Sequence, residues 1–255
     1  MTPIWSEEAG DPDAPLVVVV HGTMDRAAGM LRLSRKLDHR YRVLRYDRRG
    51  YGRSNPHDGP FDMASQVHDL VSLLRGRTAV LVAHSYGGNV ALATAALHPE
   101  LVAGVALYES PMSWTSWWPG TTAGSVATAA KERSDADAAE LFMRRLIGDR
   151  RWEELPERTR VTRRAEGAAM VGELTDLRAH EPWRPEQITV PVMVGRGTRG
   201  APHHVEGMAR MADLIASAEL VTLEGCRHDA PTSHPTEFFH LLVEPLMARV
   251  GAPWA

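Results

Sequence analysis

The chain has 255 residues, of which 44% are hydrophobic and 24% charged, and its formal net charge is −3. This length suits one domain, or one domain with a modest insertion, and the composition of an ordinary soluble globular protein excludes the disordered and fibrous classes. The small negative charge gives no long-range attraction to nucleic acid or to an anionic membrane, so we expect neither as a partner.

The N-terminus and the cysteine content bear on location and cofactors. The segment from Met1 to Glu8 has neither a basic n-region nor an apolar h-region. The longest aliphatic run, Leu16–Val20, is far shorter than the ~20 apolar residues that span a membrane. Cys226 is the single cysteine, so the chain has no internal disulfide and no cysteine cluster for zinc. We therefore expect a cytoplasmic protein that needs no cofactor and no metal.

Short apolar runs alternate with longer segments of helical periodicity. Runs of this kind are typical of interior strands in a parallel sheet, because crossover helices cover both faces of such a sheet. Residues 64–74 and 88–97 have helical periodicity, and the second segment ends at His98-Pro99. The alternation predicts an α/β fold with an open, mostly parallel sheet and helices on both faces. The predicted strands are Leu16–Val20, Tyr41–Tyr46, Ala79–Ala83, Val102–Leu107, Val190–Gly195 and Glu219–Leu223.

The alternation stops between about Ser110 and Pro182. This stretch contains no convincing strand, and its two helix-like segments are residues 131–146 and 158–177. We predict a helical insertion at residues 110–183, with the core formed by residues 1–109 and 184–255. The arginine-rich residues 158–164 have acidic residues on both sides, which favours a solvated helix face over a basic binding site.

The most specific motif follows the predicted strand 79–83, where His84-Ser85-Tyr86-Gly87-Gly88 leads into a helical segment. A serine on a sharp strand-to-helix turn is exposed for attack and needs small residues two positions to either side, which Ala83 and Gly87 provide. The helix start also favours developing negative charge. The alternative is a serine that only caps the helix.

Three other loops complete the pattern. After the first predicted strand comes His21-Gly22-Thr23, where the N–H of Thr23 could pair with that of Tyr86 to bind an oxyanion. The glycine-rich loop from Asp47 to Ser54 is interpreted as structural. After the last predicted strand, the loop Glu224–Asp229 contains His228.

Together these motifs resemble the α/β-hydrolase superfamily over nearly the whole chain, apart from the insertion. The resemblance implies Ser85 as nucleophile, His228 as general base, the N–H groups of Thr23 and Tyr86 as oxyanion hole, and the insertion as a cap over the active site. A serine rather than an aspartate favours acyl transfer over haloalkane dehalogenase or epoxide hydrolase chemistry. The motifs on which the resemblance rests are His21-Gly22, Asp47-Arg48-Arg49-Gly50-Tyr51-Gly52-Arg53-Ser54, Ala83-His84-Ser85-Tyr86-Gly87 and Gly225-Cys226-Arg227-His228.

The acid of the triad departs from the family pattern. The family usually places it after the strand that corresponds to 190–195, but this loop has no carboxylate and Gly200 stands where an aspartate is expected. Glu109 follows the strand before the insertion, and some haloalkane dehalogenases resemble this arrangement. Catalytic groups collect at the carboxyl ends of such strands, so Glu109 could accept the Nδ1–H of His228. The alternative is an ion-paired glutamate at the hinge of the insertion.

Other polar residues near the motifs have competing interpretations. Glu206 is the second candidate for the acid, although we expect it on the following helix, and Asp229 adjoins His228 too closely to orient its ring. His203-His204 lack a third ligand and are interpreted as loop residues rather than a metal site. Cys226 is expected to be packed.

The substrate pocket is the least specific prediction. We expect His84 to shape the pocket rather than to transfer a proton. The tryptophans of the insertion either line an apolar pocket or form the core of the cap. The residues assigned to the pocket are His84, Trp114, Trp117 and Trp118.

The sequence therefore predicts a serine hydrolase that cleaves a carboxylic ester-type bond through an acyl-enzyme intermediate. Thioesters, lactones and the C–C bonds of 1,3-diketones are further possible substrates. The alternatives are a cofactor-free haloperoxidase (perhydrolase), a C–C bond hydrolase or lyase on the same fold, and a non-catalytic small-molecule receptor. The expected partner is a small ester-like molecule, and the sequence predicts no oligomeric state.

Overall fold

The centre of the protein is a seven-stranded sheet, seen in a computed structural model that describes residues 3–122, 124–125 and 134–251. Its strands are β1 Ser6–Ala9, β2 Leu16–Val20, β3 Arg42–Tyr46, β4 Ala79–His84, β5 Val102–Tyr108, β6 Val192–Gly197 and β7 Ala218–Leu223. Their order in the sheet is β1-β3-β2-β4-β5-β6-β7, and every neighbouring pair is parallel except β1 and β3. The predicted mostly parallel sheet is confirmed.

Strands β1 and β6 differ most from the prediction, whereas each of β3, β4, β5 and β7 differs by one residue at one end. The sequence did not predict β1, whose residues are mostly exposed at the sheet edge and carry no apolar alternation. Strand β6 begins at Val192 rather than at Val190, directly after Pro191. A proline has no N–H to donate to the sheet ladder, so Pro191 contributes only its carbonyl, which accepts from Val105 N at 2.9 Å.

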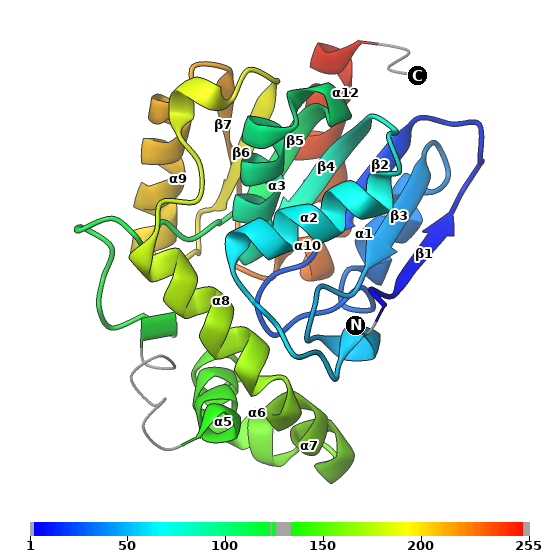
Figure 1. Ribbon diagram of the computed structural model, residues 1–255. Helices are drawn as coiled ribbons and strands as arrows, with labels where there is room; N and C mark the ends of the chain where they lie inside the picture. Colours follow the sequence, from blue (N-terminus) through cyan, green and yellow to red (C-terminus); the bar gives the residue numbers. More distant parts are fainter. Residues whose placement is uncertain (1–2, 123, 126–133, 252–255) are drawn as a thin grey trace.

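Successive strand residues point to opposite faces of the sheet, and each face is covered by helices (Figure 1). One face, which includes Val18 and Leu81, packs against α2 Met63–Leu74, α3 Tyr86–Leu97 and α9 Pro202–Leu214. The other, which includes Val17 and Val82, packs against α1 Leu31–Leu37 and α12 Glu244–Val250. This double cover explains why β2 is buried along its whole length.

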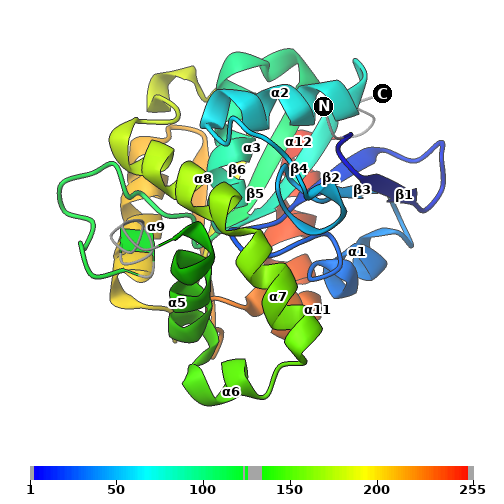
Figure 2. The ribbon, with the colours of Figure 1, turned by 60° about the horizontal axis from the view of Figure 1, so that its bottom comes forward.

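The regular structure that is described between β5 and β6 is helical, with loops at residues 109–122 and 180–184. It contains α5 Asp135–Ile147, α6 Asp149–Glu153, α7 Glu157–Ala165 and α8 Gly167–Ala179. Figure 2 shows α5, α7 and α8 lying across one end of the sheet. The start of the predicted helix 131–146 lies partly outside the described residues, and the boundaries of the core and cap stay a prediction.

The predicted helix 158–177 is two helices that meet at Glu166. A Cβ on Gly167 would lie 2.1 Å from the carbonyl oxygen of Asp135, so this glycine lets the start of α8 contact α5. The carboxylate of Glu166 is fully buried and accepts from Arg26 Nη2 at 2.6 Å and from Gly52 N at 2.9 Å. The bend at Glu166 thus directs a buried acid toward the core.

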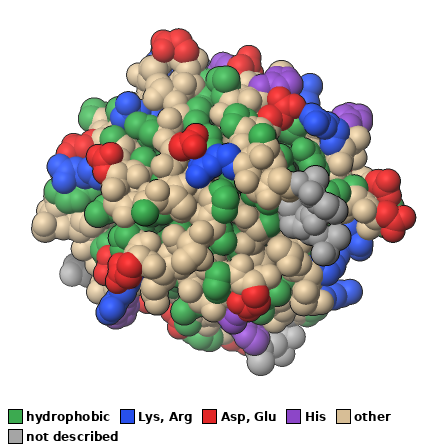
Figure 3. All heavy atoms as spheres, turned by 90° about the horizontal axis from the view of Figure 1, so that it is seen from above, with side chains coloured by type: hydrophobic (Ala, Val, Ile, Leu, Met, Phe, Trp, Pro, Cys, Tyr) green, Lys and Arg blue, Asp and Glu red, His purple; other side chains and the backbone are tan. Residues whose placement is uncertain are grey.

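Short elements fill the remaining loops. They are η1 Gly52–Ser54, η2 Pro99–Leu101, η4 Pro185–Gln187, α10 Ala230–Ser233, α11 Pro235–Phe238 and η5 Phe239–Val243. Within the described ranges, no helix combines the length and apolar character of a membrane span. On the face seen from above in Figure 3, Lys and Arg side chains lie among Asp and Glu side chains, so its charge is mixed.

Candidate active site

Ser85 lies on a strained bend between β4 and α3. Its φ is 54° and its ψ is −128°, a combination that a residue with a side chain rarely adopts. The N–H of Ser85 donates to the carbonyl of Tyr108 at 2.9 Å, which fixes the bend to β5. A Cβ on Gly87 would lie 2.5 Å from the carbonyl oxygen of Val20, so the start of α3 can approach β2 only because residue 87 is glycine. This is the local geometry expected of an exposed nucleophile.

The loop after β2 lies directly against this bend. A Cβ on Gly22 would lie 2.9 Å from the Cβ of Ser85. The next residue, Thr23, lines the same cavity as Ser85. Tyr86 is the first residue of α3, so its N–H has no carbonyl partner within the helix. The two N–H groups predicted to bind an oxyanion therefore belong to the two segments that flank Ser85.

Unusual backbone conformations gather at this place. Among described non-glycine residues, φ is positive at Met24, Arg75, Ser85 and Glu109. Arg75 ends α2 in the left-handed conformation, which is common at helix ends. The other three belong to the loop after β2, the bend and the end of β5. Such conformations cost of order 1–3 kcal/mol each and are found most often at functional sites.

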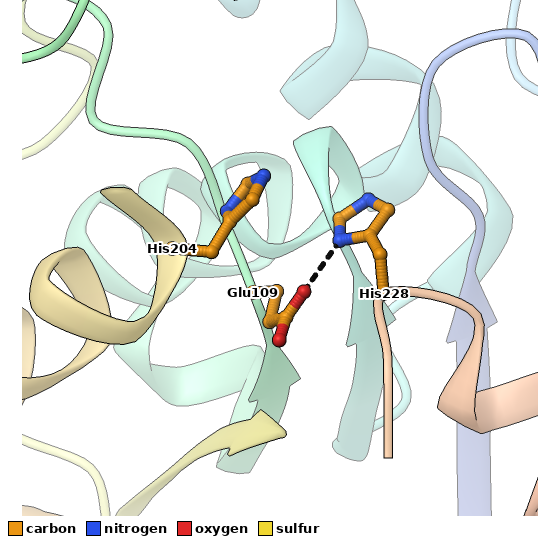
Figure 4. A group of neighbouring side chains, drawn as sticks. All are labelled: Glu109, His204 and His228. Atoms are coloured by element: carbon orange, nitrogen blue, oxygen red, sulfur yellow. Dashed lines mark hydrogen bonds and ion pairs between the residues drawn. The ribbon is translucent and has the colours of Figure 1, made fainter. Parts of the chain in front are cut away.

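The side chains of Glu109 and His228 are joined by a hydrogen bond (Figure 4). Nδ1 of His228 lies 2.8 Å from Oε2 of Glu109, whose side chain is fully buried. The other carboxylate oxygen, Oε1, accepts from Gly197 N at 3.1 Å. Because a carboxylate only accepts, Nδ1 of His228 carries the proton and Nε2 presents its lone pair when the ring is neutral.

The other candidate acids lie elsewhere. Glu206 is on α9, more than half exposed, and pairs with Arg210 at 2.6 Å. Asp229 is the N-cap residue of α10, directly before Ala230. A Cβ on Gly200 would lie 2.3 Å from Oε1 of Glu109, so the position where an aspartate was expected borders the carboxylate of Glu109.

His228 lies between two other imidazole rings. The centroid of His84 is 4.6 Å from that of His228, and Nε2 of His84 donates to the His228 carbonyl at 2.7 Å. Burial, together with the charge of His228, lowers the pKa of His84 to about 3. On the other side, the ring of His204 stacks on that of His228, with 4.7 Å between the ring centroids and 26° between the ring planes. Burial and His228 lower the pKa of His204 well below its usual range, so both neighbours are neutral near pH 7.

The interpretation of His203-His204 as loop residues is wrong. Both lie in the first turn of α9, which Pro202 begins, and this turn carries His204 onto His228. Glu109, His204 and His228 offer ligand atoms within 4.8 Å of one another. However, imidazole lone pairs lie in the ring planes, so two stacked rings do not aim at one ion, and Glu109 already accepts from His228. The observed arrangement is a hydrogen-bonded pair beside a stacked ring.

A cavity of about 240 Å³ connects these residues with the helical insertion. Ser85 and His228 both line it, although within the described part of the chain no hydrogen bond joins their side chains. Such bonds are often long before substrate binds. The cavity wall includes Trp118, Phe142 and Leu174, which are apolar, and one cation that the sequence did not predict, Arg178 of α8.

One of the four residues predicted for the substrate pocket lines this cavity. Trp118 lines the cavity, but His84, Trp114 and Trp117 do not. Trp114 packs edge-on against Trp183 at 5.6 Å, and Trp117 lies under the guanidinium of Arg210. His84 lies beside the ring of His228, away from the cavity lining.

A buried ion pair ties the insertion to the loop after β2. Glu173 of α8 accepts from Arg48 Nη1 at 2.5 Å, from the Tyr51 hydroxyl at 2.7 Å and from the Thr23 hydroxyl at 2.7 Å. Both members of the pair are fully buried. Arg48 also donates to the carbonyl of Gly22 at 3.0 Å. Helix α8 thus holds the loop that carries the N–H of Thr23.

The family model described as "Alpha/beta hydrolase family" matches residues 17–241, most of the chain. Among curated proteins, Epoxide hydrolase A of Mycobacterium tuberculosis is 36% identical over 110 residues, which are 41% of this chain. The match spans only 34% of that relative's own length.

Solved structures resemble the protein over almost its whole length. A thermophilic esterase from Thermogutta terrifontis, with malate bound, superposes with a TM-score of 0.78 at 21% identity and covers 98% of this chain and 94% of its own. The enol-lactonase from Burkholderia xenovorans LB400 superposes with a TM-score of 0.73 at 23% identity, and the match covers 93% of this chain and 94% of the lactonase chain. At these identities the likeness establishes the fold.

Proposed function

The chain belongs to the alpha/beta hydrolase family, and we propose that it is a serine hydrolase that cleaves a carboxylic ester-type bond through an acyl-enzyme intermediate. The hydrogen bond between His228 Nδ1 and Glu109 Oε2 carries the proposal. It holds the imidazole in the tautomer whose Nε2 can accept the hydroxyl proton of a nucleophile.

The reaction proceeds in two halves. Ser85 Oγ attacks the ester carbonyl carbon while its proton moves to Nε2 of His228, and Glu109 stabilises the imidazolium. The N–H groups of Thr23 and Tyr86 bind the oxyanion of the tetrahedral intermediate. His228 then gives its proton to the leaving alcohol. A water molecule, deprotonated by His228, attacks the acyl-enzyme and releases the acid, with the proton returning to Ser85.

The type of nucleophile supports ester cleavage over epoxide opening, although one relative is named an epoxide hydrolase. A serine hydroxyl that opened an epoxide would form an ether, and water does not readily cleave an ether. A carboxylate nucleophile would form an ester instead, which water can hydrolyse. Residue 85 is a serine, and the residues that flank it form the bend described above.

The receptor alternative depends on the missing carboxylate of the loop 195–204. The bond between Glu109 and His228 removes that reason, because the base has an orienting acid from another strand. Perhydrolase and C–C bond activities use the same residues and are distinguished by substrate rather than by geometry.

A panel of p-nitrophenyl esters of increasing acyl length tests the proposal. We expect saturable release of p-nitrophenol by the wild type and a loss of at least about 10³-fold in kcat for Ser85→Ala. Ser116→Ala, which removes an exposed serine, is the matched control and should keep wild-type activity. Hydrolysis that is unaffected by Ser85→Ala, or an absence of hydrolysis for every ester, would contradict the proposal.

A further inference from the structure

Arg178 places a cationic side chain on the wall of the cavity that Ser85 and His228 line. It lies on α8, one turn after Leu174, which lines the same wall. Its Nη2 donates to Ser125 Oγ at 2.6 Å. Its Nε is buried and has no hydrogen-bond partner among the described residues. A buried donor without a partner is costly, so contacts within the described part of the chain do not by themselves explain why the guanidinium lies here.

The charge of Arg178 is also uncompensated within the described part of the chain. Two other arginines near the site each pair with an acid: the distance from Arg26 to Glu166 is 2.6 Å, and that from Arg48 to Glu173 is 2.5 Å. Arg178 forms no such pair with any described Asp or Glu, and it donates to a serine hydroxyl instead. Unlike Arg26 and Arg48, Arg178 also lines the cavity.

The other lining residues limit which anion fits. Arg178 is the one Lys or Arg among the described residues that line the cavity. Burial lowers the pKa of His203 and of His204, so these neighbours add no positive charge near pH 7. A single guanidinium balances a single negative charge, and its planar fork matches a carboxylate. Phe142, Leu146 and Leu174 provide apolar contact for the methylene groups between that carboxylate and the reacting carbonyl.

We propose that Arg178 binds a carboxylate of the substrate, so that the enzyme prefers esters carrying one free carboxylate a few methylene groups from the scissile carbonyl. This inference rests on the proposed function, because it requires the ester carbonyl to lie at Ser85. Half-esters of dicarboxylic acids and lactones of similar size that carry a separate carboxylate are members of this class. The hydroxyl of Ser125 holds the guanidinium in place and does not neutralise it.

The test compares two substrates that differ only at the distal group. One is the mono-p-nitrophenyl ester of glutaric acid, and the other is its monoamide analogue, in which –CONH2 replaces the carboxylate. We expect the wild type to prefer the anionic ester by about 10- to 100-fold in kcat/KM, which is the fold-change that corresponds to one charge-assisted hydrogen bond. In Arg178→Met this ratio should fall toward one, and in Arg178→Lys it should remain intermediate, because a lysine keeps the charge without the fork.

The controls separate this inference from the proposed function. Arg184→Met removes an exposed charge outside the cavity and should leave the ratio at the wild-type value. A wild type that hydrolyses both esters with the same kcat/KM contradicts the role of Arg178 and leaves the serine hydrolase proposal intact. A wild type that hydrolyses neither ester nor any other p-nitrophenyl ester contradicts the proposed function itself. The wild-type ratio decides the question even if Arg178→Met does not fold.

Discussion

The carboxylate of Glu109 lies against Gly200 so closely that a Cβ on residue 200 would be 2.3 Å from Oε1. An aspartate was expected at this position, and the carboxylate that bonds to His228 comes instead from the residue after β5. The glycine at position 200 therefore leaves the space that the carboxylate of Glu109 occupies. A side chain on residue 200 and the observed position of Glu109 exclude each other.

Gly200→Ala tests this exclusion. The new methyl group would displace Oε1 of Glu109 and disturb its bond to His228, so we expect kcat for an ester substrate to fall by at least about tenfold, in line with misplacement of a catalytic group. Gly120→Ala is the control, since a Cβ there would have no atom of the described residues within 4 Å. If steady-state kinetics showed equal kcat for Gly200→Ala and the wild type, the crowding argument would be wrong.

Glu109→Gln should lower kcat by about 10³- to 10⁴-fold, because an amide favours the wrong tautomer of the base and cannot stabilise the imidazolium. Glu206→Gln changes an exposed acid that pairs with Arg210 and should leave kcat within about twofold. Both variants are measured with the same ester. Near-wild-type turnover in Glu109→Gln would remove Glu109 from the mechanism.

Glu173→Gln should destabilise the protein by about 3–5 kcal/mol, because it leaves the fully buried guanidinium of Arg48 without its counter-charge. Urea denaturation measures the free energy of unfolding. The matched change in the exposed pair, Glu206→Gln, should cost no more than about 1 kcal/mol. An equal decrease in the free energy of unfolding in the two variants would show that the buried pair stabilises the protein no more than the exposed pair does.

Stability should also depend on the neutral state of His84. Its pKa is lowered from 6.5 to about 3, chiefly by burial. Below about pH 6.5 the unfolded chain takes up a proton at this residue and the folded protein does not. The free energy of unfolding therefore falls as the pH falls from about 6.5 toward 3, with a limiting slope of about 1.4 kcal/mol per pH unit from this one ring.

His84→Gln keeps an N–H donor and cannot titrate, so its unfolding free energy should change less steeply between about pH 5.5 and 4 than that of the wild type. Urea denaturation at several pH values gives both slopes. His39→Gln removes an exposed histidine and should reproduce the wild-type slope. The same slope in His84→Gln as in the wild type would contradict a buried neutral imidazole.

The sheet could be predicted because its interior strands are apolar on both faces, and a short aliphatic run such as Leu16–Val20 is typical of a strand that helices cover on both sides. Strand β1 could not, because its residues Ser6 to Ala9 lie at an exposed edge with no pattern of burial. The bend at Ser85 could be predicted from Ala83 and Gly87, the small residues two positions to either side. The cytoplasmic location stays a prediction.

Residues that act through the insertion carry no local signal. Arg178 reaches the cavity and Glu173 reaches Arg48 only because α8 crosses the end of the sheet. His204 reaches His228 from the first turn of α9, after β6. Each looks like an ordinary surface residue of a helix in the sequence. Glu109 differs, because it directly follows a buried strand, and that position, together with the lack of a carboxylate in the loop 195–204, made it a candidate.

The central claim is that the hydroxyl of Ser85 is a nucleophile activated by His228. The most direct measurement is reaction with a fluorophosphonate probe, followed by digestion and mass spectrometry of the labelled peptide. We expect one phosphonyl group on Ser85 in the wild type, no labelling of Ser85→Ala, and labelling slowed by at least about 10²-fold in His228→Gln. A wild type that remains unlabelled, or that carries the label on another residue while Ser85 stays free, would contradict the account.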